Sequence, residues 1–370
     1  MMFPASWCVI ELECEECLPE NMPVVVTSQG GASEAGNGTV RARSGGEVTL
    51  ACAGGSFLLY PLHNLAADIQ CVSLPPQVPH CAPPLQGRVY RVRGAGAAGG
   101  VRHLATVCYD ADAGVARTSH ASNAPALHLP SHEERSAPLS LLGNFNQMFD
   151  ASTRHAAERL YSDEVRLNRR LHVMFEHERF TFAEQELGSA PLLARGYFDD
   201  QMAGAADLIS NRVAVWRSVA GGNLRHVHRD VTTLLRRERE RRPPTEVDVY
   251  VGTHEVFTLN AGSPRPELYL KPGRRFPVPR YIWTVVHVPS TNRGVALVVL
   301  NDPLVTVSEV RAAVFCESAC ASVSWLHDLV RHRNYERPVN GLAFCCSLRD
   351  FAAHVSHLPP IFNDTTTLLV

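Results

Sequence analysis

Lysine is nearly absent from this sequence of 370 residues, in which Lys271 is the single example. Arginine therefore carries almost all of the positive charge, and the formal net charge at pH 7 is only −2. A chain so close to neutrality has no global basic field to draw in a polyanion, so any nucleic-acid binding has to be local. The arginine bias is explained either by bidentate phosphate binding or by GC-rich coding, which the abundant alanine and glycine favour.

Long apolar runs are missing as well. No stretch approaches the roughly 18 uninterrupted apolar residues that a membrane-spanning helix needs, so no membrane partner is expected. Hydrophobic residues make up 45% of the chain and charged residues 19%, which is typical of a globular protein with a sizeable core. Met1–Ile10 is too short and too quickly acidic for a full signal peptide, so we expect either a truncated or misassigned start or a protein that is not exported.

Cysteine is missing from the middle of the chain, between Cys108 and Cys316. The eleven cysteines lie toward the two ends, at positions 8, 14, 17, 52, 71, 81, 108, 316, 320, 345 and 346. This distribution predicts disulfides that hold peripheral elements, and therefore a secreted protein in an oxidising compartment. Cys14 and Cys17 also have a zinc or redox CxxC spacing, although no second pair accompanies them. The odd total leaves at least one thiol free or paired between chains.

Two regions of different character follow one another along the chain. Residues 1–130 contain short strand-like runs separated by Gly, Pro and Ser, which predicts a small β-rich module tied by cysteines. Asn123–Pro138 is proline-containing and polar, as expected of a linker. Residues 139–370 combine helical periodicity with strand-like segments, which predicts a second domain that contains both helices and strands.

The second domain contains a well-defined amphipathic helix, predicted at Arg225–Arg242. Its apolar residues recur at helical spacing, at Val227, Val231, Leu234 and Leu235. It must end at Pro243-Pro244, because proline cannot continue a helix. Its last turns alternate arginine with glutamate, which indicates a solvated face with ion pairs or, as the alternative, a phosphate-binding patch. Later segments are predicted as strands at 247–250, 256–259, 267–270, 281–287 and 294–300, and as a helix near Val307–Ala312.

Two segments of this domain contain recognisable sequence motifs. Leu193–Phe198 reads LARGYF, and Asn211–Leu224 reads NRVAVWRSVAGGNL. The first resembles the (A/D)RGH element of the DNA/RNA non-specific endonuclease family, with Tyr197 at the histidine position. The second follows, without a gap, the pattern N-x-x-P-Q-W-Q-x-x-N-x-G-x-W of that family, and the segments from Val249 to Asn301 resemble its core strands. The cysteines near both ends resemble the secreted arthropod branch, which includes gut double-stranded ribonucleases.

The resemblance implies both a fold and a chemistry. The fold is the α+β, ββα-metal nuclease fold, an antiparallel sheet core flanked by helices, here with the small β-rich module at its N-terminus. The chemistry is hydrolysis of nucleic-acid phosphodiesters with one hydrated Mg²⁺. In the family a histidine is the general base, an asparagine is the one direct protein ligand of the metal, a glutamate organises the metal's waters, and an arginine beside the histidine holds phosphate.

Mapped residue by residue, the resemblance implies a substituted site. Arg195 keeps the phosphate-binding position, and Asn211 is the retained asparagine of the catalytic motif. The base position is Tyr197, and a phenol with a pKa of about 10 is a poor base at neutral pH. The metal-ligand position is Ala220, which has no side-chain oxygen. The glutamate position is His228, which cannot hold the waters of Mg²⁺ as a carboxylate does.

We therefore expect a pseudonuclease, in which the fold and nucleic-acid binding persist while Mg²⁺-dependent hydrolysis is lost or strongly reduced. Arg195, Arg225 and Arg229 are the expected nucleic-acid contacts. One alternative is an active endonuclease with displaced ligands, in which His228 binds a softer metal or takes over as base. The other is a non-catalytic extracellular interaction protein with a protein partner.

Overall fold

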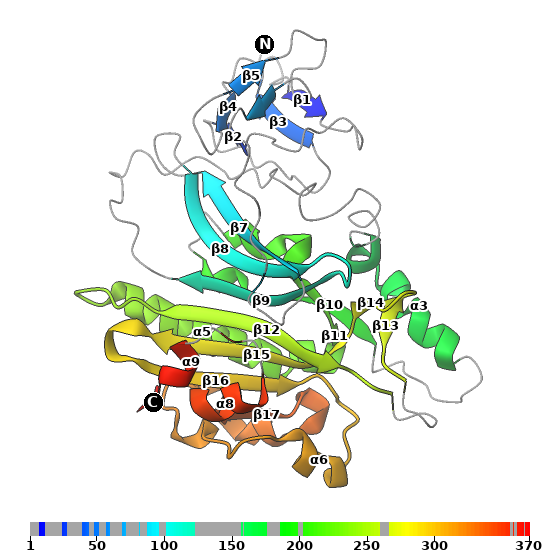
Figure 1. Ribbon diagram of the computed structural model, residues 1–370, viewed down its shortest axis with the longest axis vertical. Coiled ribbons are helices and arrows are strands. Elements are labelled where there is room, and N and C mark those ends of the chain that lie inside the picture. Colours follow the sequence, from blue (N-terminus) through cyan, green and yellow to red (C-terminus); the bar gives the residue numbers. More distant parts are fainter. Residues whose placement is uncertain are drawn as a thin grey trace, which may run out of the picture.

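The computed structural model describes 7–11, 24–27, 39–43, 48–51, 57–59, 69–71, 81, 87–95, 101–122, 157, 159–175, 186–198, 203–259, 266–355, 358, 361–365 and 367–370. Within these ranges the dominant feature is one eight-stranded sheet (Figure 1). Its strand order is β17-β16-β15-β12-β9-β8-β7, and β18 pairs in parallel with the start of β16. All other neighbours in this sheet are antiparallel. The predicted α+β class is confirmed.

The strands of this sheet come from widely separated parts of the chain. They are β7 (Arg88–Ala95), β8 (Val101–Asp110), β9 (Val115–Ser122), β12 (Asp248–Val256), β15 (Pro279–Val288), β16 (Arg293–Leu300), β17 (Ala343–Cys346) and β18 (Thr367–Leu368). The strands expected at 247–250, 281–287 and 294–300 are confirmed within a few residues. The segment expected as a strand at 256–259 forms only an isolated bridge, Thr258 to Glu267, after β12 ends.

Strands β7–β9 lie in the part of the chain expected to form a separate β-rich module. They instead continue the main sheet, because β9 pairs with β12, with Tyr250 opposite His120. Buried Ala121 and Val249 then contribute to one common core. The earlier strands pair among themselves: β1 (Trp7–Glu11) with β3 (Thr39–Arg43), β2 (Val24–Thr27) with β4 (Val48–Ala51), and β5 (Phe57–Leu59) with β6 (Ile69–Cys71). The expected linker lies outside the described residues, and the boundary between the two domains stays a prediction.

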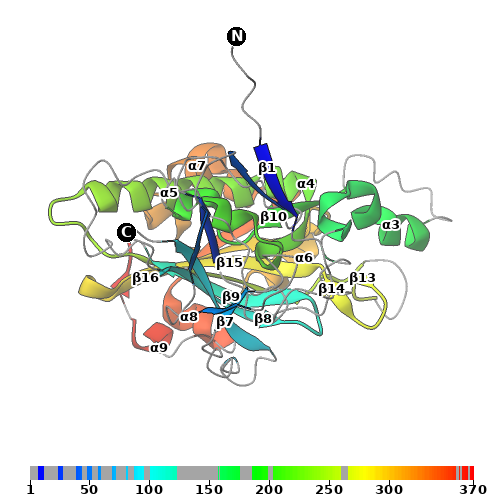
Figure 2. The same ribbon diagram turned by 90° about the horizontal axis from the view of Figure 1, so that it is seen from above.

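Helices cover both faces of the sheet (Figure 2). One face packs against α5 (Asn223–Glu240), whose Val227, Val231 and Leu235 join the larger hydrophobic core. The opposite face of β15–β17 packs against α8 (Leu348–His354) and α9 (Ile361–Asp364), with Phe351 and Phe362 buried there. Further helices are α3 (Glu164–Phe175), α4 (Arg217–Gly221), α6 (Val307–Ala313) and α7 (His327–Val330). No described helix has the length and apolar character required to cross a membrane.

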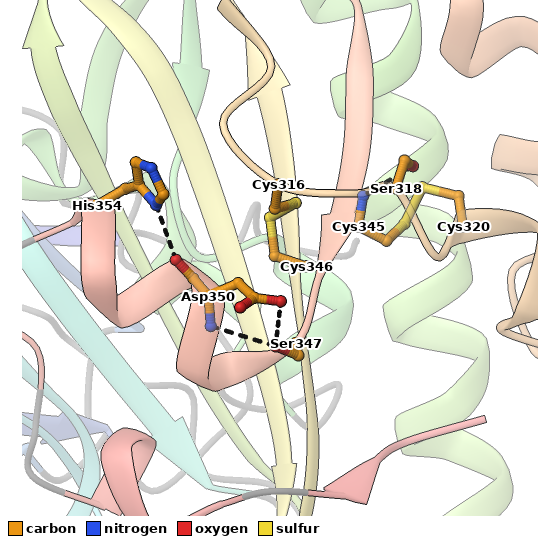
Figure 3. Close-up of a disulfide and its surroundings, with 8 residues drawn as sticks. All are labelled: Cys316, Ser318, Cys320, Cys345, Cys346, Ser347, Asp350 and His354. Atoms are coloured by element: carbon orange, nitrogen blue, oxygen red, sulfur yellow. Dashed lines mark hydrogen bonds between the residues drawn. A yellow bond between two sulfur atoms is a disulfide. The ribbon is translucent and has the colours of Figure 1, made fainter.

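The outer edge of the sheet at β17 is covered by a loop that two disulfides attach (Figure 3). Cys345 and Cys346 are consecutive strand residues, so their side chains point to opposite faces. Cys345 bonds to Cys320, and Cys346 bonds to Cys316. The Ala319 amide also donates to the Cys345 carbonyl at 2.8 Å, so the loop occupies hydrogen-bonding groups of this edge strand.

A third disulfide joins Cys81 to Cys108, so the predicted disulfide framework is confirmed for six of the cysteines. Cys14 and Cys17 lie outside the described residues, and the zinc and redox interpretations of their spacing stay untested. Cys52 also lies outside them, as do the side chains of Cys8 and Cys71, which leaves the expected unpaired thiol a prediction.

Both C-terminal disulfides close loops of similar length, with sequence separations of 25 and 30 residues. Replacing either pair by alanine should lower the free energy of unfolding by about 3 kcal/mol, because the unfolded chain gains conformational entropy when the loop is no longer closed. The Cys320/Cys345 pair should cost more, because both of its sulfurs are fully buried and their packing is lost too. Urea unfolding of the two double variants tests this, and a loss below about 1 kcal/mol for Cys320/Cys345 would contradict it.

Candidate functional site

The motif residues are brought together by a short hairpin beside the long helix. β10 (Leu187–Pro191) pairs antiparallel with β11 (Arg212–Trp216), which places the turn after β10 next to Asn211. That turn is a short 3-10 element, η4 (Arg195–Tyr197), and it contacts α5. A Cβ added to Gly196 would lie only 2.4 Å from the Thr232 side chain, so only glycine allows η4 to lie this close to the helix.

Glycine also separates α4 from α5. Gly222 lies between the two helices, where a Cβ would meet the Ser218 carbonyl oxygen at 2.5 Å and the Asn340 carbonyl oxygen at 2.6 Å. The sharp change of direction therefore requires glycine at this position. Ala220 lies on α4 just before it, and His228 lies on α5 two turns after it.

Asn211 is buried and fully engaged with the backbone. Its side-chain oxygen accepts from the Leu193 amide at 2.9 Å, and its side-chain nitrogen donates to the carbonyls of Leu193 at 2.8 Å and Ala206 at 2.9 Å. These contacts hold the segment before η4 against η5 (Ala203–Asp207). Its expected catalytic role stays a prediction, and its observed contacts support a positioning role.

Tyr197, at the expected base position, is only 2% exposed. Its ring meets the His228 ring edge to face, with centroids 5.8 Å apart and planes 85° apart. Burial raises the pKa of the Tyr197 phenol far above its ordinary value, and the neighbouring Thr284 hydroxyl offsets only part of that rise. The phenol therefore stays protonated at neutral pH, which removes it as a general base.

His228 is held in a neutral state. Burial lowers the pKa of His228 from 6.5 to about 4, against the smaller opposing effect of a hydrogen bond to the Leu192 backbone. Its Nε2 atom is buried and has no hydrogen-bond partner among the described residues. A neutral imidazole packed on a phenol supplies neither the charge nor the oxygen atoms that Mg²⁺ and its waters prefer.

The residues at the expected metal site do not fit a hydrated Mg²⁺. Ala220 has no ligand atom in its side chain and packs against the hydrophobic core. His228 turns a buried nitrogen toward the protein interior, beside Tyr197. In the ranges that the structure describes, no group of three or more His, Cys, Asp or Glu side chains is placed to hold a metal ion.

The outward face of α5 carries exposed arginines. Arg225, Arg229 and Arg236 follow one another at spacings of four and seven residues, which places them on one side of the helix. Arg229 pairs with Asp328 at 3.3 Å, whereas Arg225 and Arg236 have no ion pair with any described residue. Arg236 was not among the expected contacts, although its helical spacing from Arg225 and Arg229 is a signal that the sequence contains.

Arg195 adds a fourth cation beside this helix. Its side chain is 63% exposed and pairs with Asp207, which also binds Arg212 at 3.0 Å. Because η4 contacts the middle of α5, Arg195 lies at the flank of the same helix. We call Arg195, Arg225, Arg229 and Arg236 the arginine surface.

The last turns of α5 are only partly solvated. Glu238 is 4% exposed and pairs with Arg237 at 3.1 Å and Arg241 at 3.0 Å. Arg239 donates to the backbone carbonyls after η4 instead of facing solvent. Ion pairs do form here, but between neighbours one and three residues apart and not at the expected i,i+4 spacing. The expectation of a solvated face is wrong for Glu238, because its side chain is buried.

The sequence did not predict the roles of two buried polar side chains of α5. Asp230 accepts three backbone N–H groups, at 3.1 Å from His327 and 2.9 Å each from Asp328 and Leu329, and so caps the start of α7. Asn223 donates to carbonyls of the loop that precedes β17. Their partners lie about a hundred residues away, so no local pattern could have identified them.

The lowered pKa of His228 predicts an acid-side loss of stability. Below pH ~6.5 the unfolded chain binds a proton at this position and the folded chain does not, until the pH falls to about 4. The free energy of unfolding should therefore fall across this window by up to about 1.4 kcal/mol per pH unit. His228→Gln should flatten this slope in urea melts, whereas Tyr197→Phe should keep it; equal slopes in wild type and His228→Gln would refute the prediction.

The comparison with known proteins concerns the part of the chain that carries α4, α5 and four of the eight strands of the main sheet, β12, β15, β16 and β17. No curated protein matches the chain. Leu193–Phe198 lies before the residues that the family model matches, so the mapping of Tyr197 stays a prediction, as does the arthropod branch. The α+β architecture agrees with the ββα-metal nuclease fold expected of the family. Residues 206–351 match the model of the DNA/RNA non-specific endonuclease family, and this part of the chain is therefore similar to a DNA/RNA non-specific endonuclease domain.

Proposed function

We propose that this protein binds the phosphate backbone of nucleic acid on an endonuclease-like domain and lacks the Mg²⁺-dependent hydrolysis of the family. The observation that carries the proposal is the contact between the buried ring of Tyr197 and the partly buried ring of His228, at 5.8 Å between ring centroids. Two neutral rings pack together where the family has a base and a carboxylate. The disulfides support an oxidising, extracellular compartment as the place of action.

Phosphodiester hydrolysis needs an activated water and charge neutralisation at the phosphoryl oxygens. Tyr197 cannot accept a proton at neutral pH, because burial raises the pKa of its phenol. Loss of a general base alone costs about 10²–10⁴ in rate. Ala220 and His228 lack the oxygen atoms that position Mg²⁺, which adds to the loss.

The arginine surface supports the binding half of the proposal. Its four guanidinium groups are exposed, and arginine is suited to bidentate phosphate contacts. Two of the four are paired with single carboxylates, Asp207 and Asp328, which a phosphate can replace. Binding of this kind follows the backbone and is strongly salt-dependent.

The absence of family-type catalysis is tested by adding Mg²⁺ to the wild type with double-stranded RNA and with plasmid DNA. We expect no EDTA-sensitive cleavage. The triple variant Tyr197→His/Ala220→Asn/His228→Glu restores the three functional groups and should cleave at least about 100-fold faster than the wild type. Digestion by the wild type at a rate within about tenfold of the triple variant, abolished by EDTA, would disprove the proposal.

Binding is tested by fluorescence anisotropy with a labelled duplex over a series of salt concentrations. Arg225→Ala and Arg236→Ala should each weaken binding and lower the salt slope by about 1, because each removes one phosphate contact. Arg311→Ala is the matched control, since Arg311 is exposed on α6, in the part of the fold that packs on the opposite face of the sheet. Equal losses in all three variants would indicate a non-specific charge effect.

A second candidate is an endonuclease that uses a softer metal. The buried Nε2 of His228, which has no hydrogen-bond partner in the described part of the chain, favours it, because neutral imidazole binds Mn²⁺, Zn²⁺ or Ni²⁺ more readily than Mg²⁺. It requires cleavage that depends on one of these ions and that His228→Ala abolishes. A third candidate, an extracellular interaction protein without affinity for nucleic acid, requires that no duplex binds even at low salt.

A further inference from the structure

Three contacts hold the segment Leu193–Phe198, which presents Arg195. At its start, the Asn211 side chain accepts a hydrogen bond from the Leu193 amide and donates one to the Leu193 carbonyl. In its middle, Gly196 lies against Thr232 with no room for a Cβ. At its end, one guanidinium binds two carbonyls. Arg195 lies between these fixed points, and its exposed side chain extends from them.

The guanidinium at the end of the segment belongs to Arg239. Its Nη2 donates to the Tyr197 carbonyl at 2.8 Å, and its Nη1 is 3.4 Å from the Phe198 carbonyl. Carbonyls at the end of a helical turn have no partner within that turn. The planar fork of arginine can reach two such carbonyls at once, which an ammonium group does less well.

Arg239 therefore links η4 to the helix that carries the other arginines. It lies on α5 with Arg225, Arg229 and Arg236, and it is half-buried against the segment that presents Arg195. We propose that Arg239 is a positioning residue, which fixes η4 on α5 so that Arg195 joins the three α5 arginines in one phosphate-binding surface. This inference rests on the proposed nucleic-acid binding.

The physical effect is preorganisation. A flexible η4 would let Arg195 sample many positions, and binding would then have to order this segment at a cost in entropy. With the backbone held at three points, only the Arg195 side chain remains to be ordered. Arg239 thus acts on affinity through Arg195 and not through its own charge.

A double-mutant cycle separates this role from a general structural one. Arg195→Ala should weaken duplex binding about tenfold and lower the salt slope by about 1. Arg239→Met keeps the aliphatic length, loses both hydrogen bonds and should have nearly the same effect. The double variant should bind no more weakly than Arg195→Ala alone. Arg239→Lys, which keeps one donor, should be intermediate.

Arg241→Met is the control, because it removes one positive charge from the same end of α5, where Arg241 pairs with Glu238. It should leave the contribution of Arg195 intact. Hydrogen exchange gives a readout that needs no nucleic acid: the Tyr197 and Phe198 amides, which donate to the Ala194 and Arg195 carbonyls, should exchange faster in Arg239→Met than in Arg241→Met.

The two proposals fail in different ways. Additive losses in the double variant, or unchanged exchange at the Tyr197 and Phe198 amides in Arg239→Met, would overturn the positioning role while duplex binding by the wild type still stands. If the wild type binds no duplex at low salt, the proposed function fails and this inference with it, whatever the exchange rates show. If Arg239→Met does not fold, the same comparisons are made with Arg239→Lys.

Discussion

The packing of α5 against the sheet is the constraint on which the rest of the candidate site depends. Burial of its apolar stripe fixes the rotation of the helix, and this rotation decides which side chains face outward. Polar side chains of the same helix then fix its neighbours: Asp230 caps α7, Asn223 holds the loop before β17, and Arg239 holds η4. One helix therefore positions three segments that are distant in sequence.

Local patterns predicted those features that depend on local periodicity. α5 was predicted as Arg225–Arg242 and is observed as Asn223–Glu240, because an apolar stripe and two prolines define it. The union of β9 with β12 was not predicted, since strand pairing depends on tertiary packing. In the site, the family resemblance implied that the positions of Tyr197 and His228 would be close. Their burial and the contacts of Arg239 required the three-dimensional fold.

The substitutions that the family resemblance implies have a consistent physical logic. A base, a metal ligand and a carboxylate in one cleft are costly to desolvate, and the metal offsets that cost. In the proposed function Tyr197, Ala220 and His228 stand at these positions, where two rings and a methyl group pack together and require no metal. A cost remains at His228, because its buried Nε2 atom has no hydrogen-bond partner among the described residues and its pKa is lowered to about 4. The proposed function thus describes an exchange of active-site polarity for core packing.

The arginine surface is separable from this exchange, because its charges lie in solvent and take no part in the hydrophobic core. The packing of Tyr197 against His228 therefore need not disturb the phosphate contacts that we propose for this surface. The Tyr197 side chain is buried at the end of η4, and Arg239 donates to the Tyr197 carbonyl from α5. Burial of Tyr197 and the hydrogen bond from Arg239 thus hold the turn that presents Arg195, and the two halves of the proposed function, no hydrolysis and phosphate binding, are compatible with the same packing.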